Sequence, residues 1–132
     1  MVFVDDDEAT NAFHRIIAAK ADVAEQTLFF ISAKTALKYL SEIKSTHDFP
    51  ELIFTDINMP GMDGHEFIDA VRELPFYYEN TVLVYLITTL SNCDVAIYTK
   101  KGMKHIYFKS LKAEDLIQIV KDYTTPSGRH LR

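Results

Sequence analysis

Short apolar runs alternate with longer amphipathic segments along the whole chain. Five runs are brief and rich in β-branched or aromatic residues, which predicts strands over residues 2–4, 27–31, 51–55, 81–87 and 105–108. The segments that follow them repeat apolar residues with helical spacing, which predicts helices over residues 9–21, 33–44, 65–73, 94–101 and 111–123. Strands that are apolar on both faces and joined through helices indicate a parallel sheet covered by helices on both sides.

The same pattern assigns helix faces and ends. Ser32 is a suitable N-cap for the second helix, and Pro75 closes the third. The first helix places its apolar residues on one side, which we expect to pack on the sheet: Ala9, Phe13, Ile16, Ile17 and Ala21.

The connections restrict the topology. Right-handed crossovers between five βα units favour a doubly wound, flavodoxin-like (βα)5 sandwich with strand order 2-1-3-4-5. In such a sheet, ligands bind beyond the carboxyl ends of the strands, near the switch point between strands 1 and 3. The fold class is therefore α/β, and the strand ends are the place to search for chemistry.

Composition narrows the class of protein. A chain of 132 residues with 48% hydrophobic residues forms one domain, which we place at residues 1–124, followed by a polar tail over 125–132. The net charge of −5 argues against binding to nucleic acid through phosphate contacts. No apolar run is long enough to span a membrane, and the first residues do not resemble a secretory signal. The single cysteine, Cys93, fits a reducing compartment, so we expect a cytoplasmic protein.

Charged and hydroxyl side chains follow four of the strands. The predicted topology brings these residues to one crevice: Asp5 and Asp6, Asp56, Thr88 and Thr89, and Lys109. Two carboxylates 4 Å apart repel each other by about 4 kcal/mol at an effective dielectric constant near 20, so a cation is needed there. Lys109 can supply one positive charge, and Mg²⁺, which prefers oxygen ligands, can supply more.

The segment after the third strand is distinctive. Residues 55–64 read Thr-Asp-Ile-Asn-Met-Pro-Gly-Met-Asp-Gly. Together with Val-Asp-Asp-Asp at residues 4–7, Thr88-Thr89 and Lys109, this segment resembles the receiver domains of two-component response regulators, over about residues 1–123. The resemblance implies that Asp56 accepts a phosphoryl group from a sensor histidine kinase or histidine phosphotransfer protein and later loses it by autodephosphorylation.

The resemblance also implies a site for Mg²⁺ (or Mn²⁺). Asp6 falls on a direct metal ligand, Asp5 lies beside it and acts through water, and Asp56 shares the ion. The backbone carbonyl of Asn58 would supply a further oxygen. These residue types suit the chemistry, because a carboxylate nucleophile must stay ionised and nearby cations lower its pKa.

Two more residues are implied to touch the phosphoryl group. Thr88 falls on the switch hydroxyl, with Thr89 as the neighbouring alternative, and Lys109 falls on the lysine that pairs with the phosphoryl oxygens. Phosphoryl transfer depends mainly on positioning and on neutralising charge. The chain would then be a signalling switch and not an enzyme that turns over a substrate.

Two positions depart from the family pattern. Ser110 stands where a proline usually follows the lysine in a cis peptide bond. We expect the cis bond to be retained, at a cost of ~2.5–4 kcal/mol, because Lys109 must point into the site. Ile106 stands where the family usually has a switching aromatic residue, so the aromatic half of the switch is either absent or supplied by another side chain such as Tyr85 or Tyr98.

Partners and alternatives remain open from the sequence. We expect a downstream protein or a second copy of the chain to bind the strand-5 face, and the chain to be either a single-domain regulator or part of a longer one. Ser110 and Ile106 leave room for a receiver-like interaction module that is never phosphorylated. An aspartyl-nucleophile phosphatase of the haloacid dehalogenase type is disfavoured, because Asn58 stands where its general acid would be. A flavodoxin is disfavoured because the aspartates after the first strand would repel a phosphate.

Overall fold

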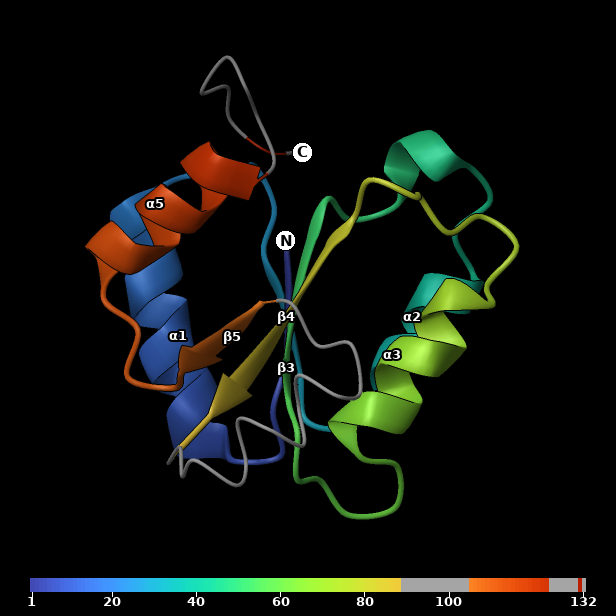
Figure 1. The fold of residues 1–132 in the computed structure, drawn as a ribbon, viewed down its shortest axis with the longest axis horizontal. Coiled ribbons are helices and arrows are strands. Elements are labelled where there is room, and N and C mark those ends of the chain that lie inside the picture. Colours follow the sequence, from blue (N-terminus) through green and yellow to red (C-terminus); the bar gives the residue numbers. More distant parts are fainter. Residues whose placement is uncertain (89–104, 124–130, 132) are drawn as a thin grey trace.

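A five-stranded parallel sheet forms the centre of the protein (Figure 1). The computed structural model describes residues 1–88, 105–123 and 131. The strand order is β2-β1-β3-β4-β5, as predicted. The strands are β1 (Val2–Val4), β2 (Leu28–Phe30), β3 (Leu52–Asp56), β4 (Val82–Ile87) and β5 (Ile106–Phe108).

Helices cover both faces of this sheet (Figure 1). On one face lie α1 (Glu8–Ala21) and α5 (Ala113–Tyr123), and on the other lie α2 (Ala33–Ser41) and α3 (Gly64–Arg72). A short 3-10 helix, η1 (Thr46–Asp48), precedes β3. The helix predicted over residues 94–101, together with Thr89, Cys93 and Tyr98, lies outside the described residues.

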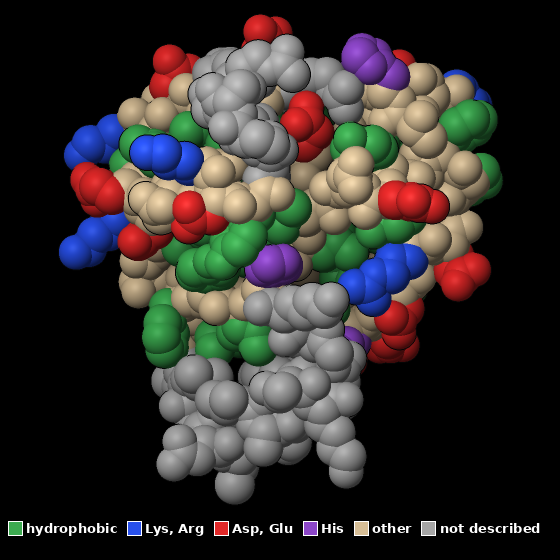
Figure 2. Space-filling view, turned by 45° about the horizontal axis from the view of Figure 1, so that its top comes forward, with side chains coloured by type: hydrophobic (Ala, Val, Ile, Leu, Met, Phe, Trp, Pro, Cys, Tyr) green, Lys and Arg blue, Asp and Glu red, His purple; other side chains and the backbone are tan. Residues whose placement is uncertain are grey.

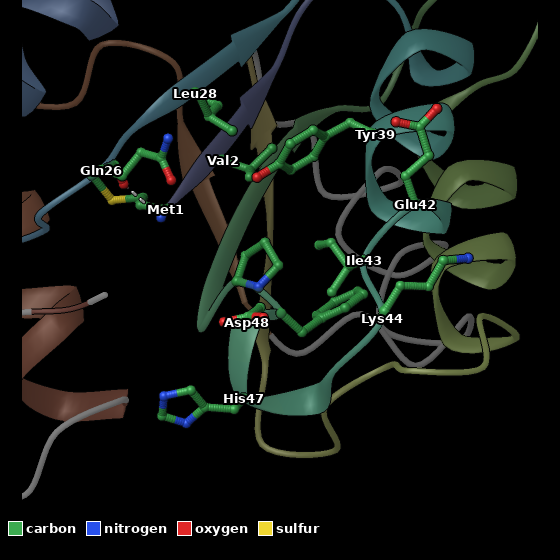
Figure 3. A pocket seen from close by; sticks show the side chains of 12 residues that line it. Met1, Val2, Gln26, Leu28, Tyr39, Glu42, Ile43, Lys44, His47 and Asp48 are labelled. Atoms are coloured by element: carbon green, nitrogen blue, oxygen red, sulfur yellow. Dashed lines mark hydrogen bonds between the residues drawn. The ribbon is translucent and has the colours of Figure 1, made fainter.

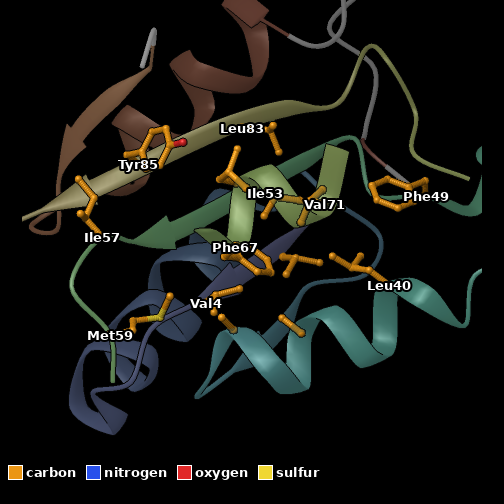
Figure 4. Close-up of a cluster of buried hydrophobic side chains, with 14 of the residues drawn as sticks. Val4, Leu40, Phe49, Ile53, Ile57, Met59, Phe67, Val71, Leu83 and Tyr85 are labelled. Carbon is orange, nitrogen blue, oxygen red and sulfur yellow. The ribbon is translucent and has the colours of Figure 1, made fainter. Parts of the chain in front are cut away.

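Each face of the sheet has its own hydrophobic core, because successive side chains of a strand point to opposite sides. In β3, Ile53 belongs to the cluster under α2 and α3, whereas Leu52 and Phe54 belong to the cluster under α1 and α5. Figure 4 shows the first cluster, in which Phe67 of α3 and Leu40 of α2 meet the sheet. All five residues of β3 are buried, so this strand is the centre of the molecule.

Polar side chains fix where two helices begin. Ser32 caps α2 as predicted, since its hydroxyl oxygen accepts the Thr35 N–H at 3.1 Å. At α3, Asp63 accepts the Glu66 N–H at 2.8 Å, and the Glu66 carboxylate accepts the Asp63 N–H at 3.2 Å, which completes a capping box. The capping box anchors the start of α3 next to the loop that follows β3.

The predicted packing face of α1 is wrong in part. Phe13 is 45% exposed and Ile16 is 68% exposed, and Ala9 is exposed as well. The buried residues of α1 are Asn11, His14, Ile17 and Ala18. Hydrophobic periodicity assigns asparagine and histidine to the solvent side, but in this helix both lie inside and bond to strand-end carbonyl groups.

The surface mixes charges of both signs and has a hollow at one end of the sheet. On the face that Figure 2 shows, Lys and Arg side chains are interspersed with Asp and Glu and do not gather into one basic patch. A hollow of about 530 Å³ lies at the amino ends of the strands, lined by residues that include Met1, Leu28, Tyr39 and Phe49 (Figure 3). No helix in the described part of the chain is long and apolar enough to cross a bilayer.

Leu131, within the segment assigned to a tail, is buried in the core under α1 and α5. Its N–H donates to the Val23 carbonyl and its own carbonyl accepts the Glu25 N–H, each at 2.8 Å. The backbone at this residue therefore pairs with the connection between α1 and β2.

Candidate functional site

Three aspartates meet at the carboxyl ends of β1 and β3. These strands are neighbours, with Val4 opposite Thr55, so the residues that follow them lie side by side. One carboxylate oxygen from each of Asp5, Asp6 and Asp56 lies within 4.8 Å of the other two. Asp5 and Asp56 are buried, whereas Asp6 is exposed. The structure therefore brings together the three acids that the sequence placed at one site.

Lys109 supplies a positive charge between the two buried acids. Its Nζ lies 3.0 Å from Asp5 Oδ2 and 3.1 Å from Asp56 Oδ2. The backbone N–H of Lys109 donates to the Ile87 carbonyl of β4 at 2.8 Å, which continues the β4–β5 ladder by one residue. The predicted convergence of strands 1, 3 and 5 on one ion-pair cluster is thus present.

The expectation of a cis peptide bond before Ser110 is wrong. No cis peptide bond occurs among the described residues, which include Lys109 and Ser110. The Lys109 side chain reaches both carboxylates from a trans peptide, so the non-proline cis bond and its cost are not needed to aim the lysine.

Local hydrogen bonds orient Asp5. Its Oδ1 accepts the Asp7 N–H at 2.9 Å, which leaves Oδ2 for Lys109. Asp7 itself caps α1, since its carboxylate accepts the Ala9 N–H at 3.2 Å and the Thr10 hydroxyl at 2.7 Å. Asp5 is therefore fixed by the turn that begins α1, and Asp7 caps the helix and is not one of the three clustered acids.

The surroundings of the site raise the pKa of both Asp56 and Lys109, which favours the neutral form of the acid and the charged form of the lysine. Burial raises the pKa of Asp56 above its usual range, and the nearby Asp5 and Asp6 raise it further, while Lys109 only partly offsets this. Burial alone would lower the pKa of the Lys109 ammonium, but its hydrogen bonds to Asp5 and Asp56 raise it overall. The lysine stays charged, and ionising Asp56 is costly unless more positive charge arrives.

Helix α3 begins in contact with the backbone of the Asp56 loop. The Gly64 N–H donates to the Ile57 carbonyl at 2.7 Å. A Cβ atom on residue 64 would lie 2.2 Å from the Asp56 carbonyl oxygen and 2.9 Å from the Ile57 Cα, closer than such atoms can approach. Glycine is required at this position for space and not for a positive φ angle, which the motif alone does not reveal.

The remaining predicted site residues lie on β4 and β5 and in the segments that follow β3 and β4. Thr88 follows β4 directly and is exposed, and Asn58 is exposed in the loop after β3. Tyr85 and Ile106 are register partners on β4 and β5 and belong to the same core cluster. Tyr85 is 4% exposed, so its ring is buried next to position 106, where receiver domains usually carry an aromatic residue.

Sequence reasoning missed two residues that contact the backbone of the site. The Asn11 amide nitrogen donates to the Asp5 carbonyl at 2.9 Å and to the Phe30 carbonyl at 3.4 Å. His14 Nε2 lies 3.1 Å from the carbonyl oxygen of Lys109. The signal in the sequence is an asparagine and a histidine three positions apart, a spacing that places both on the same side of a helix.

Comparison with known structures agrees with this geometry. The structure of a two-component response regulator from Cytophaga hutchinsonii superimposes with a TM-score of 0.78 at 24% identity, covering 92% of this chain and 93% of that one. The receiver domain of a sensor histidine kinase from Pseudomonas aeruginosa, with a magnesium ion coordinated in its active-site cleft, has a TM-score of 0.73 at 14% identity, with 92% and 93% coverage. These similarities show the fold.

Sequence comparison extends this result. The nitrate/nitrite response regulator NarL of Escherichia coli is 33% identical over 69 residues, which is 52% of this chain and 31% of NarL. The match therefore spans about a third of the length of that relative. An uncharacterised 14.6 kDa protein of Leptolyngbya boryana is 29% identical over 93% of this chain and 88% of its own length. The model of the response regulator receiver domain matches residues 1–121, and the chain therefore belongs to the response regulator receiver domain family.

Proposed function

We propose that this chain is the phosphoacceptor of a two-component pathway, in which Asp56 takes a phosphoryl group from a phosphohistidine in a Mg²⁺-dependent step. The observation that carries the proposal is the buried Asp56 carboxylate, which lies 3.1 Å from the Lys109 ammonium and beside two other carboxylates at the open end of the sheet. The donor would be a sensor histidine kinase or a histidine phosphotransfer protein.

The three carboxylates of Asp5, Asp6 and Asp56, which we call the acid cluster, fit a divalent ion. Three carboxylates and one ammonium carry −3 + 1 = −2 charges when all are ionised, and two of the three acids are buried. Asp5, Asp6 and Asp56 would hold Mg²⁺ or Mn²⁺ through oxygen, with the Asn58 backbone carbonyl as a further ligand. When bound, the ion neutralises charge on the phosphoryl oxygens and favours the ionised, nucleophilic form of Asp56.

The side chains of the protein would then position the reaction. An Asp56 oxygen forms a bond to phosphorus, and the bond between phosphorus and the donor histidine nitrogen breaks, with its electron pair returning to the imidazole. The Lys109 ammonium is close enough to turn from the carboxylate to a phosphoryl oxygen. The Thr88 hydroxyl, at the end of β4, would donate to another. Hydrolysis of the acyl phosphate at the same place would reset the switch.

Phosphorylation would change a binding surface near β5. Phe108 is 50% exposed at the end of β5 and Tyr123 is 42% exposed at the end of α5, so apolar side chains are available there for a downstream protein or a second copy. The relative named sensor histidine kinase CheAY in Helicobacter pylori, 29% identical over 69% of this chain, supports a place in histidine-kinase signalling.

Intact-mass spectrometry after incubation with Mg²⁺ and acetyl phosphate tests the proposal. The wild type should gain ~80 Da, the mass of one phosphoryl group, and the Asp56→Asn variant should gain nothing. The matched control is Asp69→Asn, which removes an exposed carboxylate on α3 and should be labelled like the wild type. Equal labelling of the wild type and Asp56→Asn, or an unlabelled wild type, would contradict the proposal, and the unlabelled result would favour an interaction module.

A further inference from the structure

We propose that His14 is a positioning residue that holds the backbone of Lys109 and so aims the Lys109 ammonium at the acid cluster. The inference rests on the proposed function and deepens it, because it concerns how the lysine of that site is kept in place. It is carried by a contact between residues 95 positions apart, in which His14 Nε2 lies 3.1 Å from the Lys109 carbonyl oxygen.

Chemistry fixes the direction of this hydrogen bond. A carbonyl oxygen can only accept, so the hydrogen is on His14 Nε2. Burial lowers the pKa of His14, although the bond to the Lys109 carbonyl and the charge of Asp5 act in the opposite sense, and the ring is therefore neutral at pH 7. In the neutral ring Nδ1 carries no hydrogen, and this buried atom has no hydrogen-bond partner among the residues that the structure describes.

Packing alone does not explain a histidine at this position. The ring is 1% exposed and stacks on Phe3 with 4.9 Å between ring centroids. A phenylalanine could make the same stack without burying the unpaired Nδ1 acceptor, which is unfavourable. The contact that a purely apolar ring would lose is the bond to the Lys109 carbonyl.

This bond completes the restraint on the Lys109 backbone. The Lys109 N–H already donates to the Ile87 carbonyl of β4 at 2.8 Å, so neighbouring elements hold both polar groups of this residue. The next residue, Ser110, is exposed and lacks the ring with which a proline would fix the backbone. Since the ammonium lies 3.0 Å and 3.1 Å from its two acids, a shift of about 1 Å would take it beyond hydrogen-bond range.

Two variants of the full chain separate positioning from packing. His14→Phe keeps an aromatic ring and removes the donor, and His14→Gln restores a donor nitrogen at a similar reach. Mass spectrometry would follow the initial rate of phosphorylation by acetyl phosphate in Mg²⁺. We expect the phosphorylation rate of His14→Phe to fall by ~10-fold or more, because a small displacement of a group in a reacting site greatly lowers the rate. The rate of His14→Gln should be close to that of the wild type.

Controls test whether the effect passes through Lys109. Leu40→Ala truncates a buried side chain in the other core and should lower stability without changing the rate for folded protein. In a Lys109→Ala background, adding His14→Phe should change the rate no further, because a residue that acts through Lys109 has nothing left to position. A wild-type rate in His14→Phe, failure of His14→Gln to restore it, or an equal slowing in the Lys109→Ala background would overturn the inference.

An NMR readout keeps the inference separate from the proposed function. Hydrogen exchange of the Lys109 ammonium should be faster in His14→Phe than in the wild type, whether or not acetyl phosphate labels the protein. If the wild type is unlabelled but exchange still differs, the phosphoacceptor proposal fails and the positioning role stands. If exchange is the same in both proteins, or if His14→Phe does not fold, the positioning role fails.

Discussion

The contact between Gly64 and the Asp56 loop gives a sharp prediction for Gly64→Ala. The added Cβ would lie 2.2 Å from the Asp56 carbonyl oxygen, whereas carbon–oxygen contacts normally begin near ~3.3 Å. The backbone of Asp56 and Ile57 must therefore move by about 1 Å relative to the start of α3, since the atoms in the way are backbone and cannot rotate aside.

Both stability and phosphorylation should respond. Overpacking of this kind costs about 1–3 kcal/mol, so the free energy of unfolding should fall, although replacing a helical glycine with alanine elsewhere usually stabilises a protein. Displacing the Asp56 backbone by about 1 Å should slow acetyl phosphate labelling by up to ~100-fold. Urea denaturation followed by circular dichroism measures the first effect, and initial labelling rates by mass spectrometry measure the second.

Gly61→Ala is the matched control in the same loop. Gly61 has φ +81° and no atom within 4 Å of an added Cβ, so alanine there meets backbone strain of about 1–2 kcal/mol without a steric clash. We expect Gly61→Ala to lose stability and to keep a labelling rate much closer to the wild type than Gly64→Ala does. If Gly64→Ala has the stability and labelling rate of the wild type, the steric reasoning is refuted.

Two further predictions concern the pKa of Asp56 and the cap of α2. Burial raises the pKa of Asp56 in the folded state. At pH values between the unfolded and the folded pKa, the folded protein therefore binds more protons than the unfolded chain. The contribution of Asp56 to stability is lost as the pH rises through this window. In urea denaturation at pH 7 without metal, Asp56→Asn should therefore be more stable than the wild type. The difference in unfolding free energy should shrink toward about pH 4. A variant that is less stable than the wild type at pH 7 would contradict this. Ser32→Ala should lose about 1 kcal/mol of unfolding free energy while its labelling rate stays that of the wild type, because the cap it removes lies in the layer of α2 and outside the acid cluster.

The sheet and the acid cluster could be predicted from the sequence because both are encoded by strong local patterns. Each strand is a short apolar run, and Asp5 and Lys109 directly follow such a run while Asp56 is the last residue of one. A parallel sheet then places the carboxyl ends of β1, β3 and β5 along the same edge without any knowledge of side-chain packing. The identities of the side chains at the strand ends were therefore sufficient to predict that Asp5, Asp56 and Lys109 lie at one site.

The packing of α1 could not be predicted in the same way, because it depends on contacts far along the chain. Asn11 and His14 are buried because the carbonyl groups of Asp5 and Lys109 accept their hydrogen bonds, and the second of these partners is 95 residues away. A polar residue with a satisfied donor can occupy a core position that periodicity reserves for an apolar one. Phe13 and Ile16 are correspondingly turned toward solvent.

The way in which Lys109 is shared explains how the site can tolerate buried charge in both states of the proposed switch. The ammonium lies almost equally far from Asp5 and Asp56, so neither buried carboxylate is left without a positive neighbour before phosphorylation. Once Asp56 carries a phosphoryl group, its charge lies further out on the phosphoryl oxygens, and the ammonium can follow that charge without losing Asp5. Asp5 is fixed by the Asp7 N–H and stays within reach of the lysine. A second buried acid therefore lets a single lysine serve both states, since leaving a buried charge unpaired would be far more costly than sharing one cation.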